Sequence, residues 1–159
     1  MKNPLLHNPH YPEKEQSLNS VALMATVHCL SGCAIGEVAG MVIGTALGWS
    51  NAETIALAVV LAFLSGYLLT MVPILRADYS YKAAMRVAFA ADTASITIME
   101  IVDNLMMLLI PGAMNAPLDS PLFWISLAIA LVIAGVAAFP VNRWLIGRGR
   151  GHALVHDYH

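Results

Sequence analysis

Residues 19–47 read NSVALMATVHCLSGCAIGEVAGMVIGTAL, a mainly apolar run that is longer than the roughly 20 residues a helix needs to cross a bilayer. Three further stretches have the same character, at 52–75, 82–110 and 121–146. Turn-forming residues separate the stretches, among them Trp49-Ser50-Asn51 and the proline-containing segment 111–121. The pattern predicts an all-α fold, an integral membrane four-helix bundle whose first span carries a ridge of glycines.

The composition supports a membrane protein. The chain has 159 residues, of which 58% are hydrophobic and 11% charged, whereas about a quarter of the residues of a soluble domain are charged. The net charge of −2 excludes a basic field suited to nucleic acid. We expect a polar N-terminal tail at 1–18 without a cleavable signal peptide, a membrane domain at 19–147 and a C-terminal tail at 148–159.

The basic residues predict the orientation of the spans, because short cytoplasmic segments retain Lys and Arg. All eight precede the first span, flank the connection between the second and third, or lie at the end of the fourth and after it: Lys2, Lys14, Arg76, Lys82, Arg86, Arg143, Arg148 and Arg150. We therefore expect a bacterial inner-membrane protein with both termini in the cytoplasm.

Two neighbouring ridges follow the first span, because residues four apart share a helix face. One ridge begins at His28 and continues through glycines predicted to pack against another helix: Gly32, Gly36, Gly40, Gly44 and Gly48. The partner helix belongs either to the same chain or to a second copy in a homo-oligomer. The other ridge places two thiols, a carboxylate and a thioether in one file: Cys29, Cys33, Glu37 and Met41.

The third span carries the remaining polar groups at membrane depth. Asp92 and Glu100 lie on one ridge, and Met99 and Asp103 lie on the next. Since the first and third spans run in the same direction, counting from their starts places Cys29 level with Asp92 and Glu37 level with Glu100. Ionisable groups inside a membrane are costly and usually mark function. We expect these two faces to meet.

This set of ligands suggests a metal. Thiol, imidazole and thioether groups suit copper(I) or zinc, and the carboxyl groups would attract the cation and take up protons. The leading hypothesis is a protein that binds a transition-metal cation, copper foremost, and transports it or hands it over. The candidate ligands are His28, Cys29, Cys33, Glu37, Asp92, Met99, Glu100 and Asp103. Haem and nucleotide are not expected.

Other interpretations remain open. The acids also fit protonated carboxyls that hold helices together, and the cysteines also fit small core residues. The glycine groove is also compatible with a non-catalytic subunit that docks on a larger membrane complex. A thiol oxidoreductase that cycles Cys29 and Cys33 is a third possibility, although an enzyme is the weaker expectation. Histidines in both tails fit exchange with a metal chaperone: His7, His10, His152, His156 and His159.

Four motifs resemble a known family. They are residues 28–44, which contain HCLSGCAIGE, residues 91–104, which contain ADTASITIMEIVDN, PGAM at 111–114 and FPVNRW at 139–144. The chain is similar to a family of small prokaryotic membrane proteins catalogued as a domain of unknown function. The resemblance implies a four-span membrane protein and no established activity.

Overall fold

A computed structural model describes residues 17–76 and 80–148, which form four α-helices and one short 3-10 turn, without a strand. The elements are α1 (Leu18–Leu47), α2 (Asn51–Arg76), α3 (Tyr81–Leu109), η1 (Ala113–Asn115) and α4 (Pro121–Gly147). The helices begin and end within one residue of the predicted stretches. The predicted tail histidines lie outside the described residues.

Local signals in the sequence explain where the helices begin and end. The Ser17 side chain accepts a hydrogen bond from the Ser20 backbone N–H at the start of α1, and Ser120 caps α4, which begins with Pro121. Gly48 ends α1 with a left-handed φ of 66°. A side chain added at Gly48 would meet no atom within 4 Å. Gly48 is therefore a helix cap and not, as predicted, part of the packing ridge.

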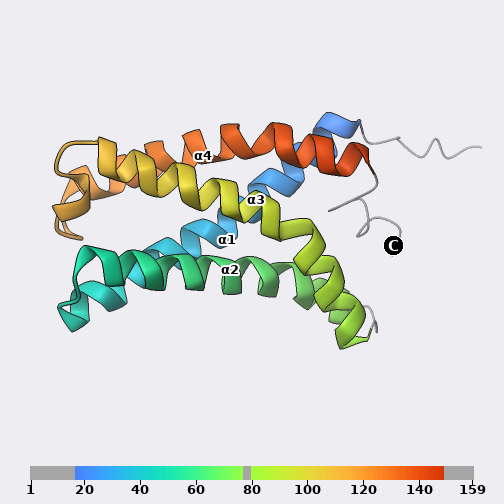
Figure 1. The fold of residues 1–159 in the computed structure, drawn as a ribbon, viewed down its shortest axis with the longest axis horizontal. Helices are drawn as coiled ribbons and strands as arrows, with labels where there is room; N and C mark the ends of the chain where they lie inside the picture. The colour runs from blue at the N-terminus through green and yellow to red at the C-terminus, as the bar shows by residue number, and fades with distance from the viewer. Residues whose placement is uncertain (1–16, 77–79, 149–159) are drawn as a thin grey trace, which may run out of the picture.

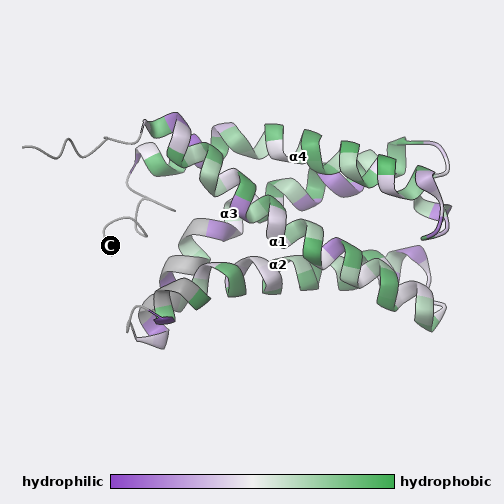
Figure 2. Ribbon diagram, turned by 180° about the vertical axis from the view of Figure 1, so that it is seen from behind, coloured by the Kyte–Doolittle hydropathy of each residue, from purple (hydrophilic) through white to green (hydrophobic). Residues whose placement is uncertain are grey.

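Among the described residues, three helices are long and apolar enough to cross a membrane: α1, α2 over Asn51–Val72, and α4. The third helix is equally long, but the carboxyl groups of Asp92, Glu100 and Asp103 lower its hydropathy. The colouring in Figure 2 reflects this difference, because α2 and α4 are green along most of their length while purple segments interrupt α1 and α3.

The first and third helices cross between the other two (Figure 1). The N-terminal part of α1 packs on α4, where Arg143 Nε donates to Asn19 Oδ1 at 2.6 Å. The C-terminal part of α1 packs on α2. The third helix does the reverse, since Tyr67 of α2 contacts Thr93 in the first half of α3, while Met107 near its end packs with Phe123 of α4. The start of α1, the end of α2, the start of α3 and the end of α4 lie at one end of the bundle, called here the terminal end. The α1–α2 turn and residues 110–120 lie at the opposite end, called the loop end.

The glycine ridge of α1 packs against a matching ridge of small residues on α2. An added Cβ at Gly36 would overlap the backbone of Ala62, and one at Gly32 would come within 2.7 Å of Gly66 Cα. Antiparallel steps of four residues continue the contact from Gly40 to Ala58 and from Gly44 to Thr54. The glycine ridge therefore packs within the chain, and α2 covers the groove that the subunit hypothesis would use for docking.

The third helix is amphipathic with its polar face turned inward. Asp92, Ser95 and Asp103 are at most 1% exposed, whereas Ile101 and Leu108 are more than 60% exposed. A helix at a water interface has the opposite arrangement. The polar face of α3 therefore lies against α1, at the crossing of the two helices.

Candidate functional site

The crossing of α1 and α3 brings the predicted sulfur ligands together with acids. The Cys29 thiol donates to Asp92 Oδ1 at 3.6 Å, and one turn further along α1 Cys33 Sγ lies 3.9 Å from Met99 Sδ. Both cysteines are free and at most 1% exposed. The two predicted faces thus meet, with Cys29 level with Asp92 as expected from counting along the helices.

Three carboxyl groups continue this file toward the loop end. Glu37, Glu100 and Asp103 are each at most 4% exposed, and Glu37 interacts electrostatically with the other two. Glu37 Oε1 accepts from Asn104 Nδ2 at 3.5 Å. Within the described part of the chain, neither oxygen of Glu100 or Asp103 has a hydrogen-bond partner. Buried carboxyl oxygens without partners are costly, so this cluster favours protons or a cation.

His28 does not join the sulfur atoms. Its Nε2 lies 2.8 Å from Thr70 Oγ1 of α2. His28 and Thr70 continue the register of the glycine ridge by one more step of four residues on each helix. The position of His28 on that ridge was the sequence signal for this placement, because the ridge packs against α2.

A buried asparagine near the terminal end was missed by the sequence reasoning. Asn142 of α4 is 2% exposed and donates from Nδ2 to Thr26 Oγ1 at 2.9 Å and to Ser95 Oγ at 3.0 Å. One side chain thus connects α1, α3 and α4 beside the Cys29–Asp92 level. The sequence signal for this role was the side-chain amide of Asn142 itself, a single amide within the FPVNRW motif of an otherwise apolar span.

The described residues contain no group of three His, Cys, Asp or Glu side chains arranged to hold a metal ion. A four-ligand zinc centre of the usual kind would need such a group. Two sulfur ligands place weaker demands on geometry, because metal–sulfur bonds of about 2.3 Å keep two sulfurs of one ion within about 4.6 Å of each other. The Cys33–Met99 separation of 3.9 Å meets that limit.

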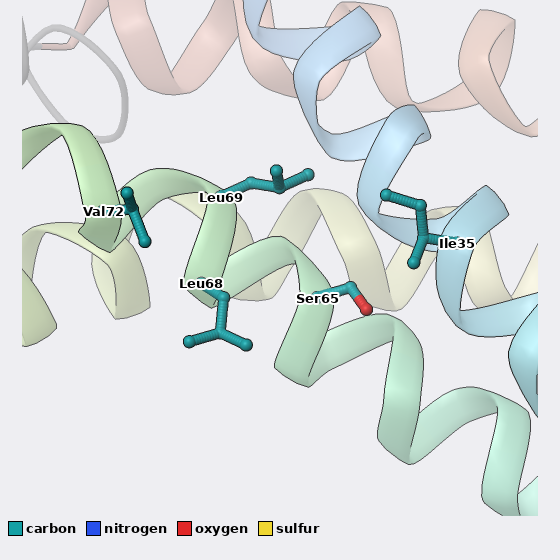
Figure 3. Close-up of a pocket in the computed structure, with 5 residues that line it drawn as sticks. All are labelled: Ile35, Ser65, Leu68, Leu69 and Val72. Carbon is teal, nitrogen blue, oxygen red and sulfur yellow. The ribbon is translucent and has the colours of Figure 1, made fainter.

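Surface grooves of about 300 to 450 Å³ lie apart from this file. Figure 3 shows one of about 390 Å³ on the outer side of the α1–α2 pair, lined by Ile35, Ser65, Leu68, Leu69 and Val72. Only the Ser65 hydroxyl is polar. None of the predicted site residues lines this groove, so the candidate site is the buried interior of the crossing.

Residues 19–151 match the family described as a domain of unknown function, DUF4396. The chain belongs to this family. The matched region of the DUF4396 protein contains nearly all of the four helices and every residue of the candidate site, and it confirms the predicted membership in an uncharacterised family. No curated protein and no solved structure matches the chain.

Proposed function

We propose that this DUF4396 protein is a four-span membrane protein that binds a transition-metal cation, copper(I) foremost, between α1 and α3 and passes it along the neighbouring acids. The observation that carries the proposal is the sulfur pair of Cys33 and Met99, 3.9 Å apart and buried beside carboxyl groups. Thiol and thioether sulfur prefer soft ions such as copper(I).

The inward polar face of α3 supports a fourth span. Since its exposed side is apolar and its acids face the bundle interior, α3 fits lipid as well as its neighbours do. The described basic residues support the predicted orientation, because their places in the helices put all of them near the terminal end: Arg76, Lys82, Arg86, Arg143 and Arg148. The terminal end is then cytoplasmic and the loop end faces outward.

The acids have two roles in this proposal. Binding of a metal ion to the Cys33 thiol releases a proton, which Glu100, the acid that interacts electrostatically with Cys33, would take up. The unpartnered oxygens of Glu100 and Asp103 would balance the positive charge of the ion as it moves between the sulfur level and the loop end. Proton transfer without a metal is the second candidate, because the same oxygens would also be stabilised by protons.

Metal analysis of the purified full-length chain tests the leading candidate. Copper(I) is offered without oxygen in competition with a chelator to the unaltered chain and to Cys33→Ser and Met99→Leu variants. Met85→Leu, on the exposed surface of α3, is the matched control. Cys33→Ser and Met99→Leu each remove a sulfur ligand. We therefore expect each to lower the affinity for copper(I) at least about tenfold, since even changes to residues that only contact a ligand can have that effect. The control should bind like the unaltered chain.

Equal copper binding by all four proteins would overturn the metal proposal. A chain that binds no copper(I), but shows a protonated-carboxyl infrared band that Glu100→Gln alters, would replace it with the proton candidate.

A further inference from the structure

A small chamber lies at the loop end of the bundle, directly beyond the acids. Its volume is about 60 Å³, more than the roughly 10–15 Å³ that a water molecule needs. Thr45, Asn51 and Thr54 are the polar residues among those that line it. Asn51 also donates to Asn115 Oδ1 at 3.1 Å, a contact that joins the start of α2 to η1 at this end.

Methionines lie between this chamber and the acids. Met41 follows Glu37 by one turn on α1, and Met107 follows Asp103 by one turn on α3. Both are buried, at 8% and 1% exposure, and belong to one cluster against which Met114 packs. Met41 and Met114 also line the chamber. Three methionines from α1, α3 and η1 thus belong to or pack on one cluster beside the chamber.

Packing alone does not require sulfur at these positions. Leucine has a similar volume and usually replaces buried methionine at little cost. What the thioether adds is an uncharged, polarizable donor that binds soft monovalent cations and leaves hard, strongly hydrated ions in water. A site of this kind beside the acidic interior would select soft cations over hard ones. Carboxyl groups alone do not distinguish well between the two kinds of ion.

We infer that Met41, Met107 and Met114 form an outer site for a soft monovalent cation, on the loop-end side of Cys33 and Met99. This inference rests on the proposed function, because it extends the same route to the loop end. In this arrangement the chamber holds the ion with its bound water molecules. The methionine sulfurs then take the place of those water molecules.

Silver(I), a redox-stable probe of soft sulfur sites, tests the outer site. Silver ions bound per purified full-length chain are counted by native mass spectrometry. The triple variant Met41→Leu, Met107→Leu and Met114→Leu keeps side-chain volume, and a double variant of the exposed Met24 and Met85 to Leu is its matched control. We expect the triple variant to bind one silver ion fewer than the unaltered chain, and the control to bind the full number.

A Cys33→Ser variant separates this inference from the proposed function. If both hold, Cys33→Ser also loses one ion, and combination with the triple variant loses two. Full silver binding by the triple variant, or an equal loss in the Met24 and Met85 control, overturns the outer site even if Cys33→Ser loses its ion. Full binding by Cys33→Ser with a loss in the triple variant overturns the inner site alone.

Discussion

Asn142 shows how much one buried amide organises this bundle. It donates to hydroxyls on two other helices, beside the level where Cys29 meets Asp92. The chemistry-bearing residues of α1 and α3 were predictable from the sequence, because few polar groups occur at membrane depth and spacing of four residues places them on common faces. The partners of Asn142 and His28 were not, because they depend on which helices are neighbours and how these helices cross.

Replacing Asn142 with Leu should destabilise the bundle. The change leaves the buried Thr26 and Ser95 hydroxyls without their donor, which we expect to lower the free energy of unfolding by about 1–3 kcal/mol. Unfolding in mixed detergent measures the loss. Adding Thr26→Val and Ser95→Ala removes the two hydroxyls that have lost their donor. This triple variant should recover part of the lost free energy of unfolding. A single variant as stable as the unaltered chain would show that the three-helix connection contributes nothing.

At the scale of elements, the α1–α2 pair is the tightest part of the fold. Glycines of α1 meet Ala58, Ala62 and Gly66 of α2 with no room for a side chain. The bounds of all four helices followed from the apolar runs and their separators. The sequence of α2 repeats small residues every four positions, at Thr54, Ala58, Ala62, Gly66 and Thr70. Without knowledge of the partner helix, that repeat looks like ordinary composition in an apolar span.

Gly36→Ala tests this contact. Because the added methyl group overlaps the Ala62 backbone, we expect a net loss of about 1–3 kcal/mol in the free energy of unfolding. The matched control is Gly135→Ala on α4, where the new Cβ would lie 3.5 Å from Leu30 Cδ2, an ordinary contact. The control should be neutral or stabilising by up to about 1 kcal/mol, since Ala favours helix over Gly. If both variants unfold alike, close packing of α1 on α2 is not what the glycines provide.

At the scale of the whole molecule, the two ends of the bundle differ. Asn142, Thr26 and Ser95 join three helices on the terminal side of the Cys33–Met99 pair, and all three are at most 5% exposed. The loop end has a chamber lined by Met41 and Thr45. In the described residues, a polar three-helix connection thus lies toward the terminal end and a chamber lies at the loop end. The connection at 110–120, which builds part of the chamber, could not be placed from sequence because its contacts join distant segments.

Cysteine labelling checks the proposed orientation. In a background of Cys29→Ser and Cys33→Ser, Ser50→Cys marks the loop end and Ser80→Cys marks the terminal end; both positions are exposed. A membrane-impermeant maleimide should label Ser50→Cys in intact cells and Ser80→Cys only after lysis, because the basic residues hold the terminal end in the cytoplasm. The reverse pattern would invert the topology, and labelling of both in intact cells would contradict four spans.

The location of the bound ion tests the central claim most directly. Crystals of the full-length chain grown with copper(I) under anaerobic conditions, measured at the copper absorption edge, give an anomalous difference map of the metal alone. The proposal predicts a peak between α1 and α3 within bonding distance of Cys33 Sγ and Met99 Sδ. A map with no peak at that level, or with copper held only outside the helical bundle, would contradict it.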